Sequence, residues 1–168
     1  MNAMKEIRIS KVTLNMSTGA PGPELEKAKK LLGMISGGKT VVKTKTKKRN
    51  TFGVAKGREI GVMTTLRGSE ARELLARLIK SLEGGLKSSQ FSARGNFSFG
   101  IEEYINIPGV TYDPEIGIMG FDVAVTLERP GYRVSKRRYA VGRVGKTHVI
   151  KPDEAIEWVK KEFSVEVS

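Results

Sequence analysis

Apolar residues recur along the chain with two different spacings. A spacing of two, typical of a strand with one covered face, occurs at 7–16, 40–45, 60–67, 96–107 and 121–128. A spacing of three and four, typical of an amphipathic helix, occurs at 23–35, 69–82 and 152–163. The order β-α-β-β-α-β-β-α predicts a single α+β domain over 1–168, a mainly antiparallel sheet with helices packed against one face.

Local signals predict where several of these elements begin, bend or end. The alternation shifts near Ser10, which predicts a bulge in the first strand. Pro23 suits the first position of a helix, and Ser69 suits the N-cap of the next one. Because the alternation of 96–107 is interrupted only at Glu103, we expect one long strand there.

Charge is distributed unevenly along the chain. There are 30 Lys and Arg against 18 Asp and Glu, a formal net charge of +12. Residues 39–67 carry nine of the cations and one acid, and residues 129–151 carry eight cations and no acid. Crowded like charges repel one another, so a polyanion is the expected partner. Composition therefore favours RNA, DNA or an acidic membrane surface.

Several function classes are disfavoured by what the sequence lacks. It has no cysteine, which excludes disulfides, zinc ribbons and thiol catalysis, and no metal-ligand cluster stands out. The single histidine, His148, sits in a Gly- and Lys-rich loop without an obvious catalytic partner, so we expect it at the surface. No signal-like or bilayer-length apolar run occurs. We expect a cytoplasmic protein with no enzyme activity, cofactor, metal, membrane contact or small-molecule substrate.

One motif argues for a different class, a small P-loop nucleotide-binding enzyme. Residues 33–40, Gly-Met-Ile-Ser-Gly-Gly-Lys-Thr, match the phosphate-binding pattern GxxxxGK[ST]. A true P-loop joins a strand to a helix N-terminus, whose free N–H groups face the phosphates. Here a predicted helix leads in and a strand leads out. We expect a helix stop and keep nucleotide binding as the alternative function.

Two basic loops are the candidate contact regions. In the loop 46–59, charge density, the possible stacking ring of Phe52 and nearby glycines favour RNA over a solvated surface run, although Phe52 could instead anchor the loop. The loop 129–151 is expected to be exposed and to suit phosphate contacts. The bend at Arg94 to Asn96 either contacts phosphate or 2′-OH groups or simply turns the chain. Nearby phenylalanines on the apolar parity are expected in the core: Phe91, Phe97 and Phe99.

Six blocks of sequence together resemble a known family. They are KVTLNM at 11–16, ISGG at 35–38, KTKTKKRNTFG at 43–53, TTLRG at 64–68, FSARGNFSFG at 91–100 and GIMGFD at 117–122. In order and spacing they resemble the large-subunit ribosomal protein L-five family, which binds 5S ribosomal RNA, across almost the whole chain. The start at the first strand and the RPGYRV block at 129–134 resemble its archaeal and eukaryotic branch.

The resemblance implies a structural role in the central protuberance of the large ribosomal subunit. Implied partners are 5S rRNA, 23S-type rRNA, P-site tRNA facing the loop between the second and third strands, and neighbouring large-subunit proteins. Many family members have glutamine at the position of Gly38, so that contact is expected to be absent or supplied by Lys39.

The expected site residues, taken from the resemblance and from the basic regions and the bend described above, form three sets. Those for 5S rRNA are Asn15, Gly38, Lys39, Thr65, Arg67, Arg94 and Asn96. Those in the tRNA-facing loop are Lys45, Lys47, Lys48, Arg49, Asn50, Phe52 and Lys56. Additional rRNA phosphate contacts are expected from Arg133, Lys136, Arg137 and Arg138.

Overall fold

The computed structural model describes residues 2–48, 54–82 and 84–168 and contains one antiparallel sheet. Its strand order is β2-β3-β1-β5-β4. The strands are β1 Arg8–Ser17, β2 Val42–Lys45, β3 Glu59–Leu66, β4 Phe97–Ile101 and β5 Phe121–Glu128. The helices are α1 Pro23–Ile35, α2 Gly68–Lys80, the short α3 Arg133–Lys136 and α4 Pro152–Phe163. Short 3-10 turns occupy Ala3–Lys5, Ser88–Gln90 and Tyr104–Asn106.

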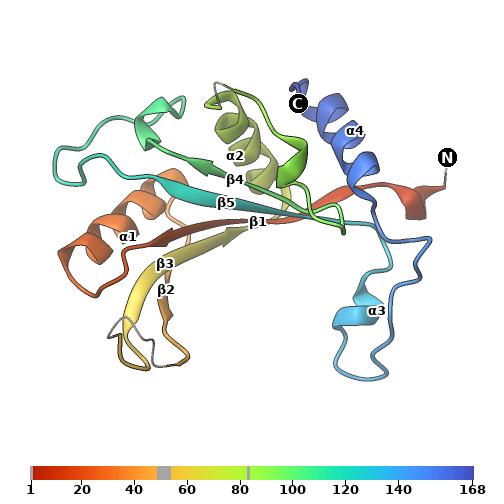
Figure 1. Ribbon diagram of the computed structural model, residues 1–168, viewed down its shortest axis with the longest axis horizontal. Helices are drawn as coiled ribbons and strands as arrows, with labels where there is room; N and C mark the ends of the chain where they lie inside the picture. The colour runs from red at the N-terminus through yellow and green to blue at the C-terminus, as the bar shows by residue number, and fades with distance from the viewer. Residues whose placement is uncertain (1, 49–53, 83) are drawn as a thin grey trace.

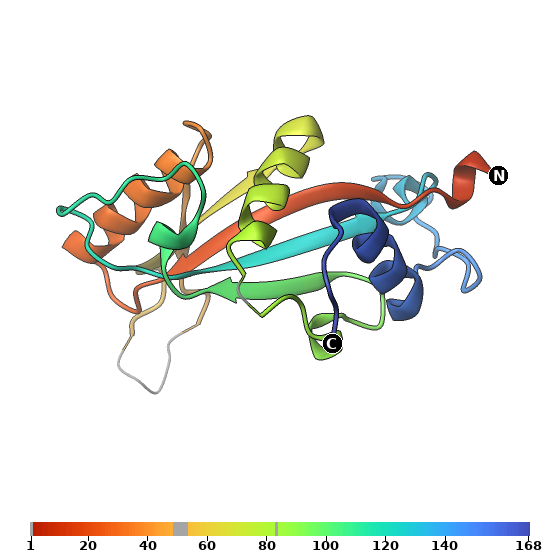
Figure 2. The same cartoon turned by 90° about the horizontal axis from the view of Figure 1, so that it is seen from above.

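Helices α1, α2 and α4 cover one face of the sheet, which confirms the predicted α+β architecture (Figure 1). Seen from above, α1 and α2 lie across the strands, with α1 packed on β3 and α2 on β1 (Figure 2). Alternate residues of the central strand β1 point into this layer and are buried: Val12, Leu14 and Met16. The opposite parity of each strand therefore faces away from the helices.

Several predicted local features are confirmed. The register of β1 against β5 shifts between Ile9 and Lys11, at the expected bulge. Pro23 opens α1, where its missing N–H costs no helical hydrogen bond. The three phenylalanines expected in the core, Phe91, Phe97 and Phe99, are all buried.

The predicted N-cap of the second helix is wrong. Helix α2 begins at Gly68, and the extended residue Arg67, with φ −141° and ψ 163°, occupies the N-cap without a side-chain capping bond. Ser69 consequently lies inside the first turn. The N-cap lies two residues earlier than the predicted Ser69 because the backbone turns at Gly68, which has φ +70°.

The predicted long strand at 96–107 is also wrong in its second half. Strand β4 ends at Ile101, and Tyr104 to Asn106 form a 3-10 turn. Tyr104 is fully buried and its hydroxyl accepts a hydrogen bond from Asp113 N at 3.1 Å, whereas Ile105 is 38% exposed. A continued strand would have buried Ile105 and exposed Tyr104, and the structure has the reverse. The chain therefore leaves the sheet near Glu103.

In the described ranges 2–48, 54–82 and 84–168, none of the helices is both long and apolar enough to span a bilayer.

The C-terminal segment packs back against the domain. Val167 forms a parallel bridge with Leu86, whose N–H donates to Glu166 O at 3.2 Å. This bridge ties the end of the chain after α4 to the segment that follows α2.

Candidate nucleic-acid interface

The face of the sheet opposite α1, α2 and α4 carries mostly small and uncharged polar side chains. We call it the outer sheet face, and its central residues are Thr13, Asn15, Met63, Thr65, Ser98, Asp122 and Ala124, of which only Asp122 is charged. The alternation that buries one side of each strand presents these residues on the other side. A wide, polar, helix-free sheet surface of this kind can make hydrogen bonds to a large flat partner.

Asn15 and Thr65, both predicted to contact 5S rRNA, lie on this outer sheet face on neighbouring strands. Thr13 is opposite Thr65 and Asn15 is opposite Met63, so Asn15 and Thr65 are diagonal neighbours. Both are partly exposed, and neither side chain forms a hydrogen bond with the other described residues. Arg67 follows at the exposed start of α2. The structure thus brings Asn15 and Thr65 to one surface, with Arg67 two positions further along the chain from Thr65.

Gly38 and Lys39 lie elsewhere, at the C-terminal end of α1. They line a hollow of about 320 Å³ between α1 and α2. Lys39 Nζ is 2.8 Å from a carboxylate oxygen of Glu70. These two residues are therefore on the helix-covered side of the domain and are not grouped with Asn15 and Thr65.

The motif at 33–40 is a helix stop, as its inverted order predicted. Gly38 has φ +81°, and its N–H donates to Gly33 O at 2.9 Å, while the N–H of Ser36 donates to Leu32 O at 3.0 Å. These amide groups close the last turn of α1 and the loop follows the carbonyl end of the helix. The geometry is unsuited to phosphate, which argues against the nucleotide-binding alternative.

The base of the basic loop 46–59 is held by backbone pairing around Thr46. Its N–H donates to Arg58 O at 2.9 Å, its carbonyl accepts from Gly57 N at 2.9 Å, and its hydroxyl donates to Ala55 O at 2.7 Å. The only acid of the region, Glu59, lies 3.2 Å from Lys43 Nζ and 3.6 Å from Lys45 Nζ. These contacts fix the direction in which the chain leaves β2 and the direction in which it enters β3.

Beyond that base, the predicted tRNA-facing cations are exposed. Lys47, Lys48 and Lys56 have no ion-pair partner among residues 2–48, 54–82 and 84–168. Lys45 is exposed as well but lies beside Glu59. The remaining predicted members of this set lie outside the described residues: Arg49, Asn50 and Phe52.

The second basic region extends from the opposite end of the sheet. Both α3 and the described ends of the β2–β3 connection lie on the side of the sheet opposite α1, α2 and α4 (Figure 1). The predicted phosphate contacts are all exposed: Arg133, Lys136, Arg137 and Arg138. Lys136 pairs with Glu128. The Arg138 guanidinium lies 5.4 Å from the centre of the Tyr139 ring. Two cationic projections therefore flank the outer sheet face.

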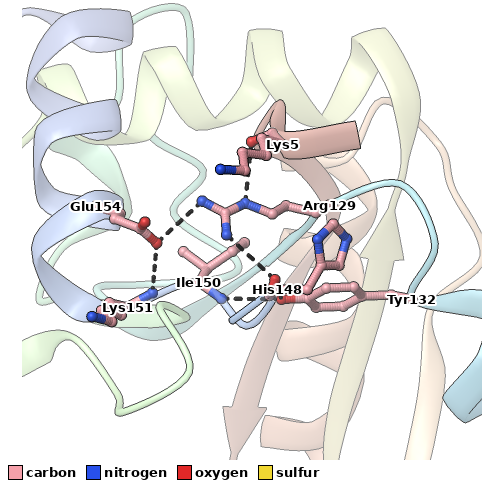
Figure 3. Close-up of polar contacts among 7 residues, drawn as sticks. All are labelled: Lys5, Arg129, Tyr132, His148, Ile150, Lys151 and Glu154. Carbon is pink, nitrogen blue, oxygen red and sulfur yellow. Dashed lines mark hydrogen bonds and ion pairs between the residues drawn. The ribbon is translucent and has the colours of Figure 1, made fainter. Parts of the chain in front are cut away.

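One residue of this region is buried, contrary to the expectation of an exposed loop. Arg129 is only 8% exposed. Its Nε donates to Lys5 O at 3.1 Å, its Nη1 donates to His148 O at 3.4 Å and its Nη2 is 3.1 Å from Glu154 Oε2 (Figure 3). The guanidinium thus joins the N-terminal segment, the end of β5 and the start of α4.

His148 is part of the same arrangement and is not a freely exposed surface residue. Its ring Nε2 is 2.8 Å from Pro130 O, and its carbonyl also accepts the Tyr132 hydroxyl at 3.2 Å. That hydroxyl in turn accepts from Ile150 N at 3.1 Å (Figure 3). We call these contacts the Arg129 joint; its residues are Lys5, Arg129, Tyr132, His148, Ile150, Lys151 and Glu154.

Glu154 is held in its charged form within the Arg129 joint. Its Oε2 accepts the Lys151 N–H at 3.0 Å as well as the Arg129 guanidinium. The backbone hydrogen bond from Lys151, followed by the bond from Arg129, lowers the pKa of the Glu154 carboxyl. The joint is therefore a charged contact that ties both ends of the basic region to the N-terminal segment and to α4.

The two predicted residues at the bend before β4, Arg94 and Asn96, differ in their surroundings. Asn96 Oδ1 accepts a hydrogen bond from Leu127 N at 3.1 Å, so its side chain ties the bend to β5. Arg94 is exposed, and both residues line an open pocket beside the basic region. The structure thus supports a turning role for Asn96, and an RNA contact by either residue stays a prediction.

Sequence comparison agrees with this architecture. Residues 2–54 match the family described as ribosomal protein L5, and residues 59–158 match the C-terminal part of the same family.

Three curated relatives are each named "Large ribosomal subunit protein uL5". The protein of Cenarchaeum symbiosum is 46% identical over 98% of this chain and 97% of its own length. That of Sulfurisphaera tokodaii is 44% identical, covering 99% and 95%. That of Tetrahymena thermophila is 42% identical, covering 96% and 94%. The members are structural ribosomal proteins and not enzymes, and this chain belongs to the ribosomal protein L5 family of the large subunit.

Proposed function

We propose that the outer sheet face binds 5S rRNA and that the loop between β2 and β3 contacts P-site tRNA. The observation that carries the first part is the position of Asn15 and Thr65. They are diagonal neighbours on a helix-free surface, and their hydrogen-bonding groups are not used by the other described residues. Short polar side chains suit the 2′-OH groups and base edges of a folded RNA.

The two cationic projections supply a different kind of contact. Exposed Lys and Arg bind phosphates, which position the RNA without specifying its sequence. The described ends of the β2–β3 connection and the cations around α3 stand at separate ends of the sheet (Figure 1). Folded RNA lying on the face would meet mostly neutral polar groups at its centre, where the exposed carboxylate of Asp122 lies opposite Asn15, and positive charge at its edges.

The two kinds of contact can be separated by measuring 5S rRNA affinity over a range of salt concentrations. Asn15→Ala and Thr65→Ala should each weaken binding by about 1 kcal/mol and leave the salt slope unchanged, because no phosphate contact is removed. Thr111→Ala, an exposed threonine in the loop before β5, is the matched control and should bind as the wild type does. Wild-type affinity in both test variants would exclude this location for the 5S rRNA site.

The tRNA contact is tested with the exposed lysines next to the clamped base of the loop. Lys47→Ala combined with Lys48→Ala should weaken binding to ribosomes that carry P-site tRNA more than binding to isolated 5S rRNA. The reason is that the loop projects away from the sheet that would hold 5S rRNA. Equal losses in the two assays would contradict separate binding surfaces.

A further inference from the structure

An open pocket of about 600 Å³ lies between the edge of the outer sheet face and the basic region. The end of β5 contributes Thr126 and Leu127 on the sheet side, and Arg94 and Asn96 come from the bend before β4. The opposite wall is made by residues that follow β5: Tyr132, Ser135, Lys136, Val141, Gly142, Arg143, Val144, Lys146 and Val149. Its volume falls in the range of about 300–1,000 Å³ typical of small-ligand sites.

The pocket combines apolar walls with cations. Val141, Val144 and Val149 give it apolar surface. Four cations line it as well, Arg94, Lys136, Arg143 and Lys146, against the single carboxylate of Glu128, which pairs with Lys136. Apolar surface beside excess positive charge matches a group that has a flat ring and a neighbouring anion.

The two ends of the segment that forms the far wall are joined to each other. The Tyr132 hydroxyl donates to His148 O and accepts from Ile150 N, and Arg129 fixes the same carbonyl of His148. Val141 on this wall is nevertheless 64% exposed. Val141 thus adds exposed apolar surface beside Val144 and Val149, which a flat ring in the pocket could cover.

We propose that this pocket accepts one unpaired base of ribosomal RNA, with the flanking phosphates on its cations. The inference rests on the proposed RNA-binding function and adds to it a base-holding site outside the centre of the outer sheet face. A base would lie against the valines and the Tyr132 ring, and the Thr126 hydroxyl could bond to its edge. The charge complementarity favours a nucleotide, whose ring and phosphate match both surfaces of the pocket.

The test fills the pocket without changing its charge. Thr126→Phe adds a ring on the sheet side, and Thr147→Phe adds the same ring at an exposed position outside the pocket as the matched control. Binding of wild type and variants to 5S rRNA and to large-subunit rRNA is measured, together with chemical modification of unpaired bases. We expect about tenfold weaker binding for Thr126→Phe, as for the loss of one stacked base, and restored reactivity of one base that the wild type and Thr147→Phe protect.

A second pair of variants tests the pocket independently, in case Thr126→Phe prevents the protein from folding. Val141→Asp places a carboxylate at an exposed site in the pocket, and Thr147→Asp places the same charge outside it. The pocket proposal requires a larger loss for Val141→Asp and exposure of the same base. Wild-type base protection in both Thr126→Phe and Val141→Asp would overturn it while leaving the 5S rRNA site intact. Failure of the wild type to prefer either ribosomal RNA over an unrelated folded RNA would overturn the proposed function and the pocket together.

Discussion

Arg129 at the end of β5 and Glu154 in the first turn of α4 form an ion pair with an N–O distance of 3.1 Å. Arg129 is buried, and its other nitrogens bind the carbonyl oxygens of Lys5 and His148. The single side chain therefore connects the N-terminal segment, the basic region and the last helix. This connection orders a cationic surface that lies next to the proposed RNA-binding face.

Replacing Arg129 with methionine should destabilise the protein. The change leaves two backbone carbonyls and the Glu154 carboxylate without their donor, which should lower the free energy of unfolding by about 1–3 kcal/mol. Urea unfolding measures the loss. Arg133→Met removes an exposed cation from the same region and should change stability by less than about 0.5 kcal/mol. Equal stability of the two variants would show that the buried contacts contribute nothing.

The Glu154 carboxyl should make the stability depend on pH. Its pKa in the folded protein is below the ordinary value of 4.5, chiefly because the Lys151 N–H binds the charged form. The stabilisation is therefore complete above pH 4.5 and is lost as pH falls through the lowered pKa. The difference in unfolding free energy between wild type and Glu154→Gln should shrink between pH 7 and pH 3. The contributions of the other carboxyls, including Asp113, are the same in both proteins and cancel in this comparison. A difference in unfolding free energy that stays constant with pH would contradict the contacts of Glu154 with Lys151 N–H and Arg129.

Gly95 should be less tolerant of a side chain than a glycine with the same backbone conformation elsewhere. Gly95 and Gly117 both have positive φ, +71° and +76°, so alanine strains the backbone at either site. At Gly95 an added Cβ would also lie 2.6 Å from Ile150 Cγ2, whereas Gly117 has no atom within 4 Å of that position. Gly95→Ala should be about 1–3 kcal/mol less stable than Gly117→Ala in urea unfolding. Equal values would show that Ile150 moves aside freely.

The elements that the sequence predicts well are those specified by neighbouring residues. Helix α1 begins at Pro23 and buries the predicted stripe, and the bulge of β1 lies where the alternation shifts. Each of these signals involves residues within a turn or two of one another. The structure therefore follows the local pattern wherever burial of one face is the dominant requirement.

Two of the failed predictions depend on contacts with residues that are not neighbours in the sequence, whereas the N-cap at Ser69 failed because the adjacent Gly68 turns the backbone. The partners of Arg129 lie 124 and 25 positions away, at Lys5 and Glu154, so no local pattern distinguishes it from the exposed arginines around it. Tyr104 likewise leaves the strand pattern because it is buried and bonds to Asp113. Asn15 and Thr65 were identified through the family motifs, since a partly exposed amide or hydroxyl on a strand has no characteristic spacing. Asn15 and Thr65 lie on one surface only because the sheet order places β3 beside β1, and local sequence patterns do not specify that order.

The most direct test of the central claim asks which face of the domain lies against 5S rRNA. The chain has no cysteine, so a single introduced cysteine can carry a tethered iron chelate that cleaves nearby RNA by hydroxyl radicals. Ser98→Cys places the chelate at an exposed position on the outer sheet face, and Glu73→Cys places it on α2, on the helix-covered side. We predict strong, localised cleavage of 5S rRNA from position 98 and little from position 73. Strong cleavage from position 73 with none from position 98 would contradict the assignment of the outer sheet face to 5S rRNA.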